Sequence, residues 1–295
     1  MVRYGTIIKV IDDELSKCKA TANAKYLGSN GIWSSSTDQW GHSVDILTYP
    51  DGTRITFDRF GDIMEVGDED GFSAKYETVN GTVPQFDSFP NDIRERYGEE
   101  GYRLFMDYTN FKMSTIGMYF NSYLRGEMSK DEFYSKVESW VGGFGQGDFG
   151  QRWTRGMTGT QIADYLIEND GKYQEMCNGS LNGYGDFATI RQVGKLHSND
   201  NLGKRIVKDS GYTSSSVGMS RTEIDETLDI NGGWTIITKC KDGNPANRGL
   251  YLGYPEYKNM GFNCWFEVLN APGQKFMRTH IDEENRIIIQ EPYEP

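Results

Sequence analysis

The sequence predicts an α+β fold in which a helical segment precedes a mixed sheet. Between residues 92 and 141, apolar residues recur at the three- and four-residue spacing of amphipathic helices. After residue 200, short apolar runs separated by Gly, Pro and Asn predict strands. Helices and strands that are segregated along a chain are typical of α+β domains, whereas βαβ arrays alternate them. A length of 295 residues allows one large domain or two of ordinary size.

The first part of the chain predicts a small helix-plus-sheet module. An apolar stripe over residues 6–26 predicts an amphipathic helix. The runs Val44–Tyr49 and Arg54–Phe57 flank Pro50-Asp51-Gly52-Thr53, which has the turn chemistry of a β-hairpin.

Two more strands, Ile63–Val66 and Ser73–Val79, lead to a candidate domain boundary. Residues 83–91 combine two prolines with polar residues and predict a linker. We therefore expect two domains, residues 1–85 and residues 86–295. The first contains no catalytic constellation, so the sequence assigns it no role.

Helices are expected where the second domain begins. Ser129-Lys-Asp-Glu132 is a capping box, which predicts a helix from there through Val141. The glycine-rich residues 142–150 lack the lysine of a phosphate-binding loop and predict a connector. The apolar stripes of two further helices are Leu104, Tyr108 and Phe111, and Ile116, Phe120 and Leu124.

Short elements and loops are expected over the rest of the chain. Arg152–Met157 predicts a strand and Thr160–Glu168 a short helix. The polar, Gly- and Asn-rich residues 169–200 predict a long insertion. Further strands are expected at Lys204–Ser216, Trp234–Lys239, Gly249–Gly253 and Arg286–Gln290.

A carboxylate interrupts the apolar run Cys264–Leu269, which ends at the turn Ala271-Pro-Gly273. Such a run predicts a buried strand, and Glu267 within it would be desolvated unless a partner stabilises its charge. One interpretation is a catalytic carboxylate that faces a cleft. The other is an edge strand whose alternation exposes Glu267 to water. The pattern alone leaves both open.

Charge and composition exclude several functions. The formal net charge of −12 argues against sequence-independent nucleic-acid binding, which needs a basic face. No apolar run reaches the length of a membrane span and no secretory leader is evident, so we expect a protein that is cytoplasmic or delivered into a target cell by a leaderless route. We expect no metal site, because neither the cysteines nor the histidines show ligand spacing. These residues are Cys18, Cys177, Cys240, Cys264, His42, His197 and His280.

Several short motifs follow one another in a recognisable order over about residues 95–290. They are Asp107-Tyr-Thr109, Asn121-Ser-Tyr-Leu-Arg-Gly126, Thr154-Arg-Gly-Met157, Asp209-Ser-Gly-Tyr-Thr-Ser-Ser-Ser216, Gly249–Gly253 and Phe266–Phe276. The third resembles an arginine motif, the fourth a Gly-aromatic-x-Ser-Thr-Ser strand, and the last a glutamate followed by Val-Leu and Pro-Gly. Together they resemble the bacterial-toxin-like and phage-type mono-ADP-ribosyltransferases.

This resemblance implies a two-sheet ADP-ribosyltransferase-like core that uses NAD as its substrate and no metal. Glu267 would stabilise the oxocarbenium-like centre that forms when the nicotinamide–ribose bond breaks. Arg155 would bind the diphosphate with two hydrogen bonds, and Ser214 would orient Glu267 and contact the ribose. Gly156 and Ser216 complete the implied NAD site.

The acceptor of the ADP-ribose group is left open by the sequence. Most transferring members of the family carry Glu or Gln two positions before the catalytic glutamate, where this chain has Trp265. Unless Trp265 faces the core of the sheet, it forms with Tyr254 and Tyr257 an aromatic surface that suits a flat acceptor such as a nucleobase better than an arginine. The implied partners are a protein or nucleic-acid acceptor, with a cognate inhibitor or antitoxin as a further candidate. An NAD glycohydrolase and a catalytically inactive binding module remain the alternatives.

Overall fold

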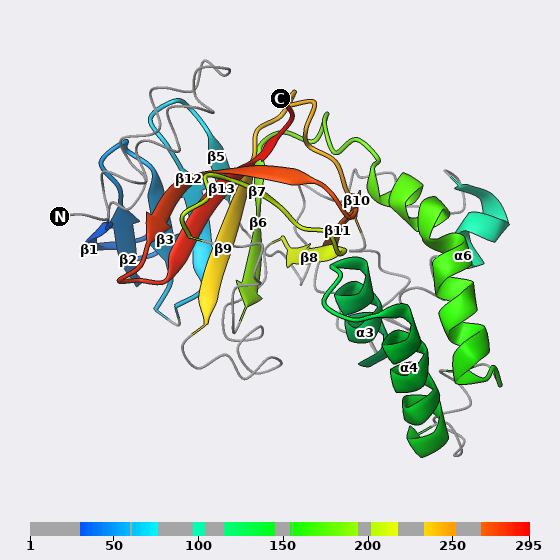
Figure 1. Ribbon diagram of the computed structural model, residues 1–295. Coiled ribbons are helices and arrows are strands. Elements are labelled where there is room, and N and C mark those ends of the chain that lie inside the picture. The colour runs from blue at the N-terminus through cyan, green and yellow to red at the C-terminus, as the bar shows by residue number, and fades with distance from the viewer. Residues whose placement is uncertain are drawn as a thin grey trace.

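The computed structural model shows an α+β protein, so the predicted fold class is confirmed (Figure 1). Its described residues are 30–59, 61–75, 97–103, 115–144, 154, 156–193, 202–217, 233–251 and 267–295. Within them, the helices are α3 (Thr115–Leu124), α4 (Lys130–Phe144) and α6 (Gly159–Cys177), and residues 97–103 are also helical. None of the described helices is long and apolar enough to cross a membrane.

A five-stranded antiparallel sheet is formed by the first part of the chain. Each strand pairs with the next in the chain, so the sheet is a simple meander. The predicted hairpin turn is confirmed, since the Tyr49 N–H bonds the Thr53 carbonyl and Gly52 adopts a φ of 81°. The strands are β1 (Ile32–Thr37), β2 (Ser43–Thr48), β3 (Arg54–Phe57), β4 (Ile63–Gly67) and β5 (Ser73–Lys75).

An eight-stranded mixed sheet occupies the second half of the chain, in the order β10-β11-β8-β6-β9-β13-β12-β7. Its described pairings are antiparallel except for β9 with β13, which are parallel. The strands are β6 (Phe187–Val193), β7 (Ile206–Lys208), β8 (Thr213–Ser216), β9 (Trp234–Cys240), β10 (Leu250–Tyr251), β11 (Glu267–Asn270), β12 (Lys275–Asp282) and β13 (Ile287–Tyr293).

Two expectations for the middle of the chain are wrong. Residues 169–200 do not form a long insertion, because α6 continues to Cys177 and β6 lies inside the eight-stranded sheet. Polar residues within β6, among them Arg191, obscure its strand pattern. The described residues of the segment 152–157 do not form a strand either, since Thr154 is helical and Gly156 lies in a turn.

Most of the other predicted elements are confirmed. Helix α4 begins after Ser129, whose hydroxyl accepts the Glu132 N–H at 3.2 Å as the capping box predicts. Strands β1 and β12 were not predicted. The predicted helix over residues 6–26, the apolar stripe over residues 104–111 and the linker at residues 83–91 lie outside the described residues.

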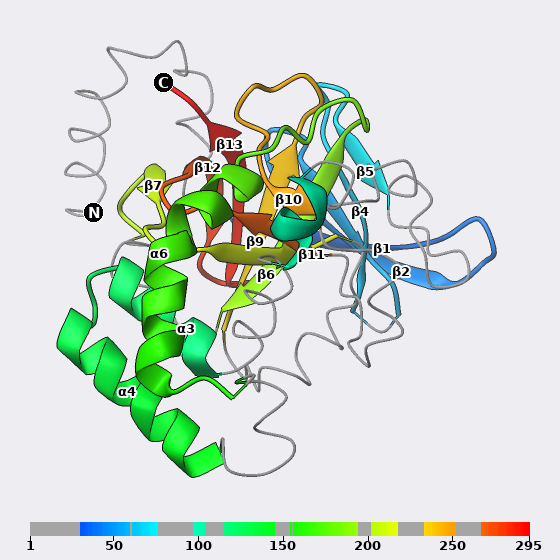
Figure 2. The same cartoon turned by 90° about the vertical axis from the view of Figure 1, so that its right-hand side faces the viewer.

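The two sheets share one hydrophobic core (Figures 1 and 2). Leu47, Ile55 and Val66 of the meander are completely buried together with Ile237 and Ile289 of the eight-stranded sheet. A sheet with one apolar face must bury that face against another layer. The two predicted domains, residues 1–85 and residues 86–295, therefore both contribute side chains to this one core.

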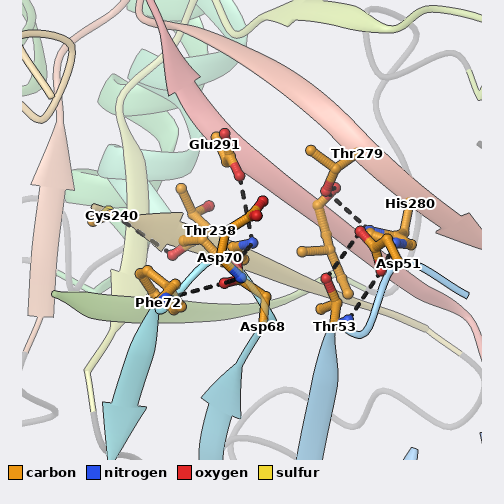
Figure 3. A network of polar contacts seen from close by, with 12 residues as sticks. Asp51, Thr53, Asp68, Asp70, Phe72, Thr238, Cys240, Thr279, His280 and Glu291 are labelled. Atoms are coloured by element: carbon orange, nitrogen blue, oxygen red, sulfur yellow. Dashed lines mark hydrogen bonds and ion pairs between the residues drawn. The ribbon is translucent and has the colours of Figure 1, made fainter. Parts of the chain in front are cut away.

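Polar contacts from two hairpin turns also join the meander to the second sheet (Figure 3). In the β2–β3 turn, Oδ1 of Asp51 lies 3.1 Å from Nε2 of His280, which is completely buried in β12. In the β4–β5 turn, Asp68 pairs with Lys239 of β9. Burial opposes ionisation of Asp51, but the contact with His280 and the Thr53 N–H hold its pKa at about 2.

A second core lies between the helices and the other end of the eight-stranded sheet. Phe120 of α3, Phe133 of α4 and Ile162 of α6 are completely or almost completely buried in it, with Val268 and Leu269 of β11. In Figure 1 the helices accordingly lie beside β8 and β11, on the side opposite the meander. This core supports the two strands that carry the predicted serine and glutamate motifs.

Candidate active site

Ser214 and Glu267 meet on neighbouring strands of the eight-stranded sheet. The Ser214 hydroxyl donates a hydrogen bond to Oε1 of Glu267. Both residues are partly exposed, whereas the other residues of β8 and β11 are buried. Because β11 lies between β8 and β10, the strand that carries Glu267 is not an edge strand of the sheet. The Glu267 carboxylate has a bonding partner and still reaches the surface.

The register of the two strands places a second serine beside the same carboxylate. Glu267 lies directly opposite Ser216, and Leu269 lies opposite Ser214. Since successive side chains of a strand point to opposite faces, Ser214, Ser216 and Glu267 share one face of the sheet. Ser214 is the diagonal neighbour of Glu267, within reach of its hydroxyl.

The opposite face of β8 lines a small cavity. Thr213 and Ser215 contribute to its wall, with Arg191 of β6 and Asn270 of β11. Its volume of about 20 Å³ suits a water molecule and is far too small for a dinucleotide. A large ligand that contacts Glu267 must therefore approach from the other face of the sheet.

Asp209, just before β8, connects three of the motif segments. Arg125 donates two hydrogen bonds to its carboxylate, from Nε to Oδ1 at 2.8 Å and from Nη2 to Oδ2 at 3.1 Å. Its carbonyl accepts the Gly273 N–H at 2.6 Å, which joins it to the turn after β11. Burial opposes ionisation of Asp209, but Arg125, the Gly211 N–H and the more distant Arg191 outweigh it and lower its pKa.

The start of β8 is also held directly by the helices. The Tyr212 N–H donates to Oδ1 of Asn121 at 2.8 Å, and the Tyr212 hydroxyl donates to Oδ1 of Asp170 at 2.8 Å. A Cβ atom on Gly211 would lie 2.9 Å from Cζ of Arg125, so this close approach requires glycine. The helical motif at residues 121–126 therefore positions the serine strand.

Half of the predicted site residues lie outside the described part of the chain. These are Arg155, Trp265, Tyr254 and Tyr257. Gly156 is described, and it is exposed in the turn before α6 with a φ of 74°. The parts that these five residues play in the site stay predictions.

Sequence reasoning assigned no role to Arg125, Asp209 or Arg191. Arg125 and Asp209 stand within recognised motifs, but they are 84 residues apart and nothing in their spacing pairs them. Arg191 gave a weaker signal, as a single charge within the run Phe187–Val193. Its Nη1 lies 3.7 Å from Oδ2 of Asp209, which brings a second guanidinium to the base of the serine strand.

No family model and no curated protein matches the sequence. Solved structures that are similar to the chain are ADP-ribosyltransferases. The Vis toxin, an ADP-ribosyltransferase from Vibrio splendidus, is 14% identical over 71% of this chain and 91% of its own, with a TM-score of 0.28. C3stau2 from S. aureus, solved with NAD, is 11% identical over 61% and 87%, with a TM-score of 0.29.

A third similar structure is BECa, an ADP-ribosylating toxin of C. perfringens, solved with NADH. It is 12% identical over 97% of this chain and 84% of its own, with a TM-score of 0.31. At these scores the functional argument rests on the chain's own residues. It is in its sequence motifs that this chain resembles the bacterial mono-ADP-ribosyltransferase toxins.

Proposed function

We propose that this chain is an NAD-dependent mono-ADP-ribosyltransferase, a toxin or phage-related effector that transfers ADP-ribose from NAD to a macromolecular acceptor. The observation that carries the proposal is the hydrogen bond from Ser214 to Glu267 on a partly exposed face of the sheet. A carboxylate that is fixed by a neighbouring hydroxyl and open on one side is suited to stabilise positive charge developing on a substrate.

Glu267 is proposed to act at the bond that breaks. Cleavage of the nicotinamide–ribose bond leaves an oxocarbenium-like ribose, as glycosidic cleavage does. The carboxylate stabilises this positive centre and accepts a hydrogen bond from a ribose hydroxyl. Ser214 holds Oε1 in place, so the group does not have to reorient during the reaction. Ser216 lies directly opposite Glu267 on the same face of the sheet; it is buried in the free chain, and we propose that it completes the NAD site beside the carboxylate.

Arg155 and Gly156 are proposed to hold the diphosphate of NAD. A guanidinium binds phosphate oxygens with two hydrogen bonds, which a lysine ammonium does not reproduce. The exposed Gly156, with its positive φ, lets the backbone approach a ligand closely. Arg155→Lys should therefore raise the KM for NAD with a smaller change in kcat, and calorimetry that finds unaltered NAD affinity in Arg155→Ala would remove this residue from the site.

The catalytic proposal is tested with labelled NAD and a cell lysate. Glu267→Gln should lower turnover by about two to three orders of magnitude, the usual loss when one key electrostatic group is removed, with NAD binding little changed. Ser214→Ala should reduce turnover less, through a looser Glu267. The matched control is Ser215→Ala, because this serine belongs to the same strand but faces the small cavity. Near-wild-type turnover in Glu267→Gln would refute the assignment.

An NAD glycohydrolase is the second candidate, and Trp265 is the feature that favours it. In the same assay, label on a macromolecule indicates transfer, whereas free ADP-ribose alone indicates hydrolysis. If transfer occurs, we propose a flat acceptor that stacks on Trp265, Tyr254 and Tyr257. Agmatine should then stay unmodified, and Trp265→Ala should abolish labelling without changing NAD hydrolysis. Efficient modification of agmatine would contradict this.

A further inference from the structure

Among the described strands, β1 is an edge of the meander. It is the first strand of that sheet, and no described strand pairs with its outer side. All six of its residues are exposed. Natural sheet edges usually carry a charge, a proline or a bulge that prevents pairing with another chain. The sequence Ile32-Trp-Ser-Ser-Ser-Thr37 has no charge and no proline, and its ladder with β2 has no irregularity.

The ladder with β2 determines which backbone groups of β1 face outward. The Asp38 N–H donates to the His42 carbonyl, so the backbone N–H and C=O groups of Asp38 face the β2 side of the hairpin. Along an antiparallel strand, residues bonded to the neighbour alternate with residues that are not. Counting back from Asp38, the residues bonded to β2 are Ile32, Ser34 and Ser36. The N–H and C=O groups of Trp33, Ser35 and Thr37 therefore point away from the sheet.

Exposed apolar side chains gather on the same hairpin. Among the described residues, three of the four exposed large apolar side chains lie on β1 or at the tip of the β1–β2 hairpin: Ile32 at 74% exposed, Trp33 at 49% and Trp40 at 63%. A groove of about 410 Å³ lies on the adjoining face of the sheet, and its lining includes Ser36, Val44 and Trp40. Trp33 points to the opposite face of the sheet from Ile32, and its indole N–H donates to Oδ1 of Asn285 at 2.9 Å. Ile32 and Trp40 are therefore the exposed apolar side chains that a partner could cover.

We propose that β1 pairs antiparallel with β1 of a second copy of the chain, about a twofold axis through Ser35. In this register Trp33 lies opposite the partner's Thr37 and Ser35 lies opposite the partner's Ser35. The outward N–H and C=O groups of both copies then all find partners, as a self-complementary interface requires. The two meanders become one continuous sheet.

The side chains agree with this register. Small serines occupy its centre, and no charged residue lies opposite a like charge. The exposed Ile32 lies opposite the partner's Asp38, at the hairpin tip that also carries Trp40. An unrelated extended peptide could use the same edge, but only a second copy brings together the exposed apolar groups at both ends of β1.

The oligomeric state of the full chain in physiological salt tests the proposal. Light scattering on a sizing column at tens of micromolar should show a dimer. Ser35→Pro removes the N–H at the twofold axis but spares the ladder with β2, so it should raise the dimer Kd by about 100-fold, as expected for unmade buried hydrogen bonds, without changing the circular dichroism spectrum. Ser35→Ala keeps the N–H and should remain dimeric. NAD turnover should be the same in both variants, which separates this test from that of the catalytic proposal.

Cross-linking tests the register. Ser35→Cys should form an intermolecular disulfide under mild oxidation, because Cα atoms of a hydrogen-bonded pair lie about 5.5 Å apart. The control is Ser34→Cys, whose counterpart in the partner is a diagonal neighbour at roughly 7–8 Å, too far for a relaxed disulfide. A monomeric wild type, a dimer that survives Ser35→Pro, or equal cross-linking at both positions would overturn the proposal.

Discussion

Replacing Arg125 with methionine should destabilise the fold by about 3 kcal/mol at pH 7, because it leaves Asp209 buried without its main partner. The side chains of Arg125 and Asp209 are only 7% and 11% exposed. Breaking a buried ion pair from one side costs roughly 3–5 kcal/mol. The lower end applies here, since Asp209 keeps the Gly211 N–H at 2.8 Å and Arg191 at 3.7 Å.

Thermal denaturation followed by circular dichroism measures this loss. For a chain of 295 residues, about 3 kcal/mol corresponds to a drop in Tm of roughly 5 °C. The pKa of Asp209 is lower in the folded state than in the unfolded state. The ion pair therefore makes its full contribution to folding stability above the ordinary aspartate pKa of about 3.9, and this stabilisation is lost as the pH falls through the folded-state pKa. The difference in Tm between wild type and Arg125→Met should therefore shrink below about pH 4.

A matched control is Lys172→Ala, which removes the exposed ion pair between Lys172 and Glu100. Exposed pairs contribute little, so its Tm should match that of the wild type. The reasoning would be refuted by an unchanged Tm in Arg125→Met at pH 7. It would also be refuted by a difference in Tm that does not diminish as the pH falls.

Three further predictions concern the same contacts between segments. Gly211→Ala should displace Arg125 and lower stability by about 1–3 kcal/mol, and urea denaturation should show that this loss is not additive with Arg125→Met. Asp51→Asn should lower the free energy of unfolding by about 2 kcal/mol at pH 7. The difference in stability from the wild type should decrease as the pH is lowered from about 4 to about 2, because the Asp51 carboxylate beside His280 stabilises the fold above its unfolded pKa and loses this effect as it protonates. Deleting residues 1–85 should give an insoluble or unfolded protein by sedimentation and circular dichroism, since it uncovers the shared core; a folded, active truncated chain would contradict this.

Much of the local structure could be predicted from the sequence, because local signals act within a few residues. The Pro50-Asp51-Gly52-Thr53 turn joined the two strands it predicted, and the Ser129–Glu132 capping box marked the start of α4. The α+β class followed from the segregation of the two periodicities along the chain. Glu267 stood out because a charge within an apolar run is costly unless it has a partner.

Tertiary structure alone decided the contacts between these parts. The bond of Ser214 to Glu267 was implied only by resemblance, and the pair of Arg125 with Asp209 by nothing in the sequence, since residues 84 positions apart share no period. Strand β6 escaped prediction because its polar residues, among them Arg191 beside the small cavity, break the apolar pattern of an internal strand. The core that the meander shares with the eight-stranded sheet could not be predicted for a related reason: a sequence shows that a face is apolar, but only the fold shows which surface covers it.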